Sequence, residues 1–213
     1  MTRILIVDDH PVLRHGLRAL LESRPGWEVC GEASDGRDAV RLAEALQPDV
    51  VVMDLTMPGL NGLDALRQIK TALPPVEILV FTVNDSELAM REAIRHGARG
   101  FVLKSEVKEQ LFAAVEALSR HYPYFAGSAA QTVLDGFLRG AGAETAPGPP
   151  LTSREREVVQ LLAEGQGNKA IAETLSISAK TVDGHRTSAM RKLGVHSLAE
   201  LIRYAIRNGL AAP

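Results

Sequence analysis

The stretch Asp49-Val-Val-Val-Met-Asp54 decides the fold, because the short apolar run within it ends on a carboxylate. Unbroken apolar runs of this length are typical of strands that are buried on both faces of a parallel sheet. Other β-rich runs in the first half of the chain also end on polar side chains. They are Ile4 to Val7 before Asp8-Asp9, Ile78 to Phe81 before Thr82, and Phe101 to Leu103 before Lys104. A strand followed by a chemically active side chain is therefore a repeated feature of this sequence.

Between these runs, apolar residues recur at spacings of three and four, which indicates amphipathic helices. Strands are expected at 3–7, 28–33, 49–53, 77–81 and 100–103. Helices are expected at about 11–23, 36–46, 62–72, 86–96 and 106–119, with a sixth at 129–138. This alternation predicts an α/β doubly wound fold of the flavodoxin type, with a five-stranded parallel sheet and helices on both faces.

The predicted topology gathers the polar side chains at one edge, because the carboxyl ends of parallel strands lie together there. Asp8, Asp9 and Asp54 would crowd negative charge at that edge unless a cation entered. Magnesium suits such a set, since it takes a few carboxylates, keeps several waters and bridges to phosphate oxygens. With Lys104 and Thr82 available to bind phosphoryl oxygens, the set predicts a magnesium-dependent phosphoryl acceptor.

Each of these residues has a simpler interpretation when it is taken alone. The pair Asp8-Asp9 is compatible with a helix cap, and Asp54 with a turn before Pro58. Lys104 is compatible with an ordinary solvated lysine. Their joint placement at the ends of successive predicted strands favours the chemical interpretation.

Composition limits the class of protein. The chain has no run of eighteen apolar residues and no secretory N-terminal signal, so we expect no membrane segment and a cytoplasmic location. The single cysteine, Cys30, lies in an apolar stretch and is expected to be an inert core thiol. The six histidines show no metal-ligand spacing.

The chain divides into three segments. Residues 1–120 hold the predicted α/β domain, and residues 121–150 hold the sixth helix and a Gly/Pro-rich linker. Residues 151–213 read as a small all-α domain with helices near 153–164, 168–175, 179–193 and 197–208.

Thr152 with Glu155 is the expected capping pair of the first of these, and Ser153 with Arg156 is the weaker alternative. Basic residues exceed acidic ones by three in this last segment and fall short of them by five before it, which weakly favours a nucleic-acid-binding tail.

The turn at Ser176 to Ser178 separates two helices in the order typical of a helix-turn-helix motif, in which the second helix enters the major groove of DNA. Ile171, Leu175, Ile177 and Val182 are expected to form the core between these helices. Lys180, Gly184, Thr187 and Arg191 lie on the opposite side of the second helix. The expected phosphate contacts are Lys180, Thr181, Arg186 and Lys192. A protein-binding helical bundle is the alternative interpretation.

The first 120 residues resemble the receiver domain of bacterial two-component response regulators. The matching residues are Val7-Asp8-Asp9, Met53-Asp54-Leu-Thr-Met-Pro58 with Gly62, Phe81-Thr82, and Gly100-Phe-Val-Leu-Lys104. The resemblance implies that Asp54 is the phosphoacceptor and that Lys104 and Thr82 bind the phosphoryl group. It also implies that Asp9, Asp54 and the Thr56 backbone carbonyl bind Mg²⁺, that Asp8 acts largely through water, and that Thr82 and Phe101 form the switch. Many relatives have tyrosine at the position of Phe101, so a change of its rotamer should matter less here.

The stretch from Leu151 to Leu210 resembles the LuxR-type helix-turn-helix domain, so the whole chain resembles a NarL/FixJ-class response regulator. The matching residues are Glu155-Arg-Glu-Val158, Asn168-Lys169, Ile171-Ala172, Lys180-Thr-Val182, His185-Arg186 and Lys192-Leu-Gly-Val195. The resemblance implies base-facing positions at Asp183, Gly184 and Thr187, within an expected DNA-contacting set that also includes His185. Because relatives often have lysine in place of Asp183, target preference should differ: a carboxylate accepts from cytosine N4. Asp183 is equally compatible with a charge near a helix N-terminus.

The resemblance further implies a sensor histidine kinase and double-stranded DNA as partners, and a homodimer on activation. It also implies a signalling protein that is not a metabolic enzyme, although its receiver supports its own phosphorylation and dephosphorylation. A dehalogenase-like phosphatase would need two aspartates two residues apart, which Asp8-Asp9-His10 lacks. A flavodoxin-type phosphate binder is disfavoured because two aspartates would repel its ligand. A regulator that works without phosphorylation is the remaining alternative.

Overall fold

The computed structural model describes residues 1–83, 85–105, 108–127, 129–131, 133 and 151–211. The chain divides into two compact units, Met1–Arg139 and Gly140–Pro213. The predicted linker at 140–150 lies outside the described residues, as do residues 132 and 134–138 of the predicted sixth helix. Residues 129–131 and 133 are helical. The segment boundaries at 120 and 150 stay predictions.

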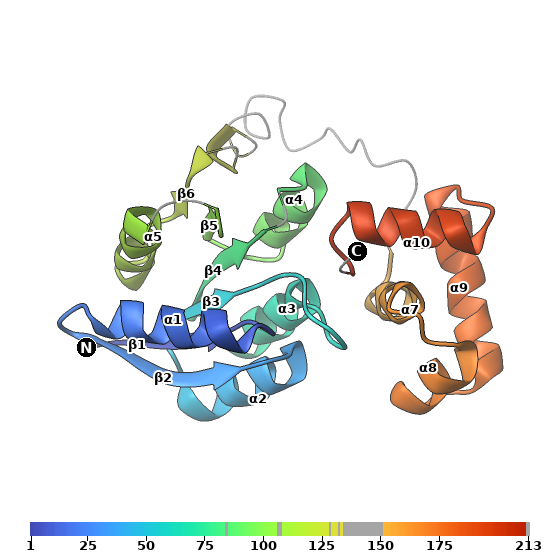
Figure 1. Ribbon diagram of the computed structural model, residues 1–213, viewed down its shortest axis with the longest axis horizontal. Coiled ribbons are helices and arrows are strands. Elements are labelled where there is room, and N and C mark those ends of the chain that lie inside the picture. The colour runs from blue at the N-terminus through green and yellow to red at the C-terminus, as the bar shows by residue number, and fades with distance from the viewer. Residues whose placement is uncertain (84, 106–107, 128, 132, 134–150, 212–213) are drawn as a thin grey trace. The chain divides into compact units, whose positions relative to one another are not determined.

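The first unit alternates strands and helices in the predicted order (Figure 1). The strands are β1 (Thr2–Val7), β2 (Trp27–Ala33), β3 (Val50–Met53), β4 (Glu77–Thr82), β5 (Gly100–Leu103) and β6 (Tyr124–Phe125). The helices are α1 (Pro11–Glu22), α2 (Gly36–Leu46), α3 (Gly62–Ala72), α4 (Glu87–Arg95) and α5 (Lys108–Ser119).

The sheet is parallel throughout, with the strand order β2-β1-β3-β4-β5-β6. The prediction of a doubly wound parallel sheet is confirmed, but the prediction of five strands is wrong, because β6 adds a sixth. β6 is only two residues long and pairs with Gly100 and Phe101 of β5. A run this short gives no period that sequence reading can detect.

Two apolar cores lie on opposite faces of the sheet. One contains buried residues of α2, α3 and α4, and the other contains buried residues of α1 and α5. Figure 1 shows these helices flanking the sheet. The β3 residues alternate between the cores: Val51 and Met53 face one, and Val50 and Val52 face the other. This two-sided burial explains why the run before Asp54 is apolar at every position.

The second unit contains only helices among its described residues: α7 (Ser153–Ala163), α8 (Asn168–Thr174), α9 (Ala179–Leu193) and α10 (Leu198–Arg207). Helix α7 begins at a capping box between Thr152 and Glu155, as the favoured frame predicted. The turn between α8 and α9 uses Ser176 in the left-handed region, at φ 53°. Ile171 and Val182 are fully buried on either side of this turn. Among the described residues, no helix has both the length and the apolar character needed to span a bilayer.

Candidate functional site

Strand register brings the acidic and basic side chains to one edge of the first unit. Val7 of β1 is paired with Met53 of β3, so Asp8 and Asp54 follow adjacent strand ends. The Asp54 amide donates to the Val7 carbonyl at 2.8 Å, which extends the ladder by one residue. Likewise, the Lys104 amide donates to the Thr82 carbonyl at 2.8 Å.

The ammonium group of Lys104 joins two buried carboxylates. Its Nζ lies 2.6 Å from Asp8 Oδ2 and 2.5 Å from Asp54 Oδ2, and both carboxylate side chains are 2% exposed. Burial lowers the pKa of Lys104, but hydrogen bonds and charge interactions with Asp54 and Asp8 outweigh burial, so the net pKa is raised. Lys104 is therefore cationic at neutral pH and holds two acids that would otherwise repel each other.

The loop after β3 fixes the orientation of Asp54. The Thr56 amide donates to Asp54 Oδ1 at 3.1 Å, so the other carboxylate oxygen is the one that meets Lys104. Gly62 packs directly against this loop: a Cβ there would lie 1.9 Å from the Asp54 carbonyl oxygen. Asn61, which is buried, caps α3 by accepting from the Asp64 amide at 2.9 Å. Only glycine fits at position 62, which explains its place in the sequence motif.

The acidic pocket has the composition of a hard-cation site. Asp8, Asp9, His10 and Asp54 each offer one ligand atom, and these atoms all lie within 4.8 Å of one another. Asp8 Oδ2 and Asp9 Oδ1 are both buried atoms, and they lie 2.6 Å from Lys104 Nζ and 2.8 Å from His10 Nδ1, respectively. Three carboxylates gathered this closely fit a cation that prefers oxygen ligands, such as Mg²⁺.

The two predicted switch residues are both buried. Thr82, at the end of β4, is 0% exposed, and Phe101 on β5 is 1% exposed. Phe101 belongs to the core cluster that also contains Met90 of α4. Its ring thus lies inside the core in this structure.

Sequence reading missed His10 as a neighbour of the acidic pocket. Its Nδ1 lies 2.8 Å from Asp9 Oδ1 and 3.2 Å from Asp8 Oδ1. The available signal was its position directly after the acid pair, which does not depend on metal-ligand spacing between histidines. Cys30 corrects another expectation: its thiol is only partly buried and donates to the Ile4 carbonyl at 3.3 Å.

Helix α9 presents most of the predicted DNA-contacting residues to solvent. Those classed as exposed are Lys180, Thr181, Asp183, Gly184, Thr187 and Arg191, and those at intermediate exposure are His185, Arg186 and Lys192. Val182 and Ala189 on the opposite face are fully buried. A Cβ on Gly184 would meet none of the described atoms within 4 Å, so packing within this unit does not require glycine there.

Several of the predicted contact residues already have side-chain partners within the helical unit. Lys192 Nζ lies 2.6 Å from Glu155 Oε2, and its side chain is 16% exposed. Ser188 Oγ donates to the other oxygen of Glu155 at 2.7 Å, so this buried acid ties α9 to α7. Arg186 forms an ion pair with Asp183 one helical turn earlier. The structure therefore gives Lys192 a structural partner, and its phosphate contact stays a prediction.

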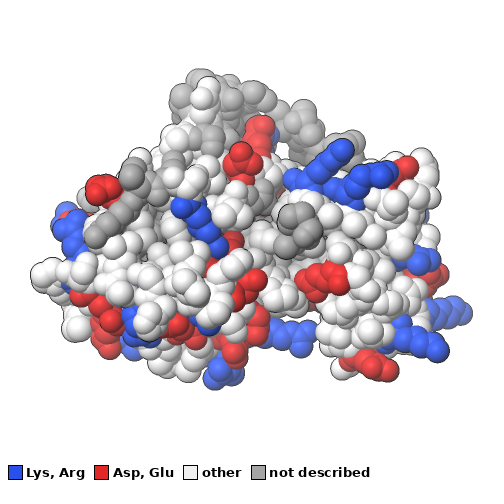
Figure 2. Space-filling view, in the orientation of Figure 1, with Lys and Arg blue, Asp and Glu red and all other residues white. Residues whose placement is uncertain are grey.

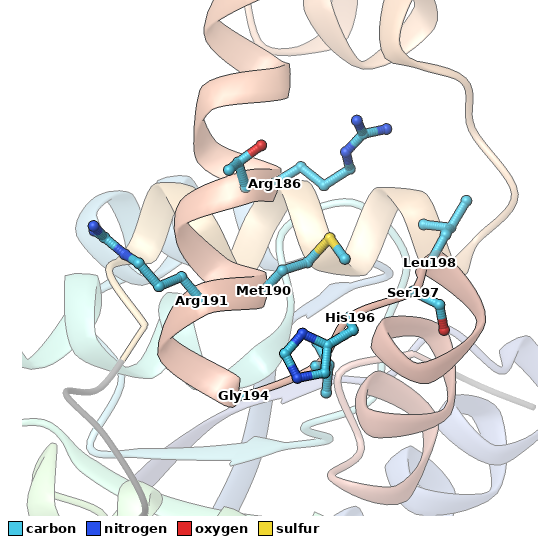
Figure 3. A pocket seen from close by; sticks show the side chains of 9 residues that line it. Arg186, Met190, Arg191, Gly194, His196, Ser197 and Leu198 are labelled. Carbon is cyan, nitrogen blue, oxygen red and sulfur yellow. The ribbon is translucent and has the colours of Figure 1, made fainter.

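A groove lies beside the C-terminal half of α9 and the start of α10 (Figure 3). Arg186 and Arg191 point away from each other in this view, and the side chains of Met190, His196 and Leu198 lie below or between them. The groove has a volume of about 660 Å³. Figure 2 shows basic and acidic side chains interspersed on the visible face of each unit, in keeping with the small charge excesses of the sequence.

Comparison with known protein families covers both units. Residues 4–116 match the response regulator receiver domain, and residues 149–205 match the bacterial regulatory proteins of the luxR family. The transcriptional regulatory protein LiaR of Bacillus subtilis (strain 168) is 41% identical over 210 residues, which are 99% of each chain. The oxygen regulatory protein NreC of Staphylococcus carnosus (strain TM300) is 38% identical over 213 residues, with 98% of each chain covered.

Solved structures agree with these matches. RcsB from Salmonella enterica serovar Typhimurium, bound to promoter rprA in the presence of the phosphomimetic BeF3-, has a TM-score of 0.67 and 30% identity over 95% of this chain and 97% of that chain. A LuxR-family two-component response regulator from Aurantimonas sp. SI85-9A1 has a TM-score of 0.61 and 39% identity over 65% of this chain and 99% of that one.

The fold, the acidic pocket and these matches together define a two-component response regulator. The chain belongs to the NarL/FixJ class of this family, in which a receiver domain is joined to a LuxR-type helix-turn-helix domain. It is a DNA-binding transcription regulator.

Proposed function

We propose that a partner sensor histidine kinase phosphorylates this chain on Asp54 in a magnesium-dependent reaction, and that phosphorylation controls transcription from specific DNA sites in the cytoplasm. The observation that carries the proposal is the convergence of Asp8 and Asp54 on Lys104 Nζ, at 2.6 and 2.5 Å, beside Asp9. A helix-capping role for the aspartates, or a solvated role for Lys104, would not require these charged groups to be buried in contact with one another.

The chemistry is a phosphoryl transfer to an oxygen of Asp54. This oxygen attacks the phosphorus of the kinase phosphohistidine, a P–O bond forms, the P–N bond breaks, and the imidazole leaves with the electron pair. Lys104, which is cationic, neutralises charge on a phosphoryl oxygen, and the Thr82 hydroxyl donates to another. The phosphoryl group is later removed by hydrolysis: water attacks phosphorus, the P–O bond to Asp54 breaks, and phosphate is released. The receiver thereby supports its own phosphorylation and dephosphorylation.

Asp8, Asp9, Asp54 and the backbone carbonyl of Thr56 would hold Mg²⁺, with Asp8 acting largely through water. When bound, this ion supplies positive charge beside the carboxylates and the phosphoryl oxygens. The chain contributes the fixed placement of these groups: the Thr56 amide orients Asp54, and Gly62 lets the loop close against it.

Phosphorylation acts as a population shift. Thr82 moves toward the phosphoryl group, and the surface formed by residues 85–104 adjusts around Phe101. The resulting state releases the DNA-binding unit or forms a homodimer whose paired units span two half-sites. Helix α10 is proposed as the dimer surface, since Leu198 is 43% exposed and Ile202 and Ile206 are only partly buried. Core packing of the helical unit explains the same apolar stripe equally well.

The phosphoacceptor is tested by labelling with radioactive acetyl phosphate in the presence of Mg²⁺. Asp54→Asn should abolish labelling, because the amide is a far weaker nucleophile than the carboxylate. Asp85→Asn is the matched control: Asp85 is an exposed aspartate in the loop after β4 and should label as the unmodified chain does. Persistent labelling of Asp54→Asn would remove Asp54 from this role.

We propose that α9 enters the major groove of DNA, with Asp183, Gly184 and Thr187 facing bases. Lys180, Thr181, His185, Arg186, Arg191 and Lys192 are proposed as flanking contacts. The exposure of Lys180, Gly184 and Thr187 on the side of α9 opposite the buried Val182 supports this orientation.

The α9 orientation is tested by the salt dependence of DNA binding. Lys180→Ala should weaken binding and reduce the slope of log K against log salt concentration by about 1, since one phosphate contact is lost. Arg120→Ala, directly after α5, changes charge equally at an exposed position and should leave the slope unchanged. An unaltered slope for Lys180→Ala would place Lys180 outside the interface.

A further inference from the structure

His10 reaches the acidic pocket with one imidazole nitrogen. Its Nδ1 lies 2.8 Å from Asp9 Oδ1 and 3.2 Å from Asp8 Oδ1. One ring nitrogen of His10 and one oxygen each of Asp8, Asp9 and Asp54 all lie within 4.8 Å of one another, so the four groups are close enough to share a metal ion.

The exposure of the donor side chains increases from Asp8 and Asp54, which are buried, to His10, which faces solvent. The side chains of Asp8 and Asp54 are 2% exposed, that of Asp9 is 29% exposed, and that of His10 is 69% exposed. A cation at the carboxylates would therefore meet the imidazole on its solvent side. Asp8 Oδ2, which lies 2.6 Å from Lys104 Nζ, marks the buried end of this set.

Divalent cations differ in how much they gain from an imidazole ligand at the exposed side of the pocket. Mg²⁺ keeps several waters and prefers oxygen ligands, so it gains little from an imidazole at the solvent side. Zn²⁺ and other first-row transition metals bind imidazole well, and each added nitrogen ligand favours them over Mg²⁺.

We propose that His10 is a ligand for borderline divalent cations, and that it makes this pocket bind Zn²⁺ in competition with Mg²⁺. The proposal rests on the proposed function only in placing the Mg²⁺ ion at the same carboxylates. Its consequence is a chain whose phosphorylation is sensitive to transition-metal cations, since Zn²⁺ held by His10 would occupy the phosphoryl-transfer site.

A substitution of His10 isolates the imidazole. His10 is the N-cap residue of α1, but its side chain makes no capping hydrogen bond within the described residues. Besides the contacts of its imidazole, its backbone amide donates to Asp8 Oδ1 at 2.8 Å, and this bond is retained in any variant except proline. His10→Gln should therefore preserve the fold. His15→Gln, at an exposed position on α1, is the matched control.

The test is calorimetric titration of the full chain with MgCl2 and, separately, with ZnCl2 in the presence and absence of saturating Mg²⁺. For the unmodified chain and His15→Gln, we expect one Zn²⁺ site for which Mg²⁺ competes. His10→Gln should weaken this Zn²⁺ site by about tenfold or more, with Mg²⁺ affinity within about twofold. Nitrogen-15 NMR of the imidazoles should show the His10 signals shifting on Zn²⁺ addition.

Equal Zn²⁺ affinity of His10→Gln and the unmodified chain would overturn the proposal. Parallel losses of Mg²⁺ and Zn²⁺ affinity would also overturn it, because they would show that His10 only orients the carboxylates. Neither result touches the phosphoacceptor assignment, which fails instead if Asp54→Asn remains labelled.

Discussion

Glu155 is a buried acid that accepts hydrogen bonds from three partners, of which Lys192 carries the opposite charge. It accepts from the Thr152 amide at 2.7 Å, from Ser188 at 2.7 Å and from Lys192 at 2.6 Å. Burial raises the pKa of this carboxyl, but the bonds from Lys192, Ser188 and Thr152 outweigh burial and lower the pKa to about 2. The capping acid of α7 thus also fixes α9.

The stability of the helical unit should fall in acid because of Glu155. Its folded-state pKa, about 2, lies below its ordinary value of 4.5, so its contribution is complete above about pH 4.5 and is lost as the pH falls toward 2. The loss should be on the order of 3 kcal/mol. Urea unfolding followed by the NMR signals of α7 and α9 would measure it.

Glu155→Gln is expected to destabilise the unit at neutral pH and to flatten this acid dependence. Glu173→Gln, an exposed acid on α8, serves as the control and should keep the unmodified profile. If Glu155→Gln retained the full acid dependence, other carboxylates would have to account for it.

Residues whose position follows from their place at the end of a strand were predictable. Asp54 and Lys104 follow apolar runs, and parallel topology alone brings strand ends together. Glu155 was predictable as a cap but not as the partner of Ser188 and Lys192, because these residues approach it only once α7 packs on α9. His10 was missed for a related reason: its proximity to Asp9 depends on loop geometry, which has no period in the sequence.

At the scale of elements, the contact between the β3–α3 loop and α3 is the tightest constraint on the acidic pocket. Gly62→Ala should destabilise the receiver by about 1–3 kcal/mol or more, since its Cβ would overlap the Asp54 carbonyl oxygen. Gly16→Ala on α1 is the matched control: no described atom lies within 4 Å of its Cβ, and it should stabilise by about 0.5–1 kcal/mol.

Urea unfolding followed by tryptophan fluorescence would compare the two variants. Trp27, the single tryptophan, packs edge-on against Phe112 with ring centroids 5.8 Å apart, so it reports on the receiver. Equal stabilities for the two variants would show that the loop moves aside and does not hold Asp54 in place.

The elements themselves were largely predictable from periodicity. The prediction for α9, 179–193, coincides with Ala179–Leu193, because a capping serine and Gly194 mark its ends. Cys30 shows the limit of pattern reading: it belongs to an apolar stretch, yet β2 lies at the edge of the sheet and leaves the thiol partly exposed. β6 had no pattern to detect.

For the whole molecule, activation should change the mass of the particle in solution. Addition of BeF3- with Mg²⁺ should convert the chain from monomer toward dimer, because the mimic favours the switched state that we propose for phosphorylation. Light scattering coupled to size-exclusion chromatography measures this directly. Asp54→Asn should not respond, and a response from that variant would mean that the mimic acts elsewhere.

The short pairing of β6 with β5 bears on how the receiver can be excised for study. The Tyr124 amide donates to the Arg99 carbonyl at 2.8 Å, and the Ala126 amide donates to the Phe101 carbonyl at 3.3 Å, so β6 covers the outer side of β5. A fragment cut at residue 120 would uncover those carbonyls and offer an unprotected sheet margin to neighbouring molecules. Fragments for crystallisation or kinase assays should therefore retain residues through at least Ala126, or self-association of the truncated piece will be mistaken for signalling.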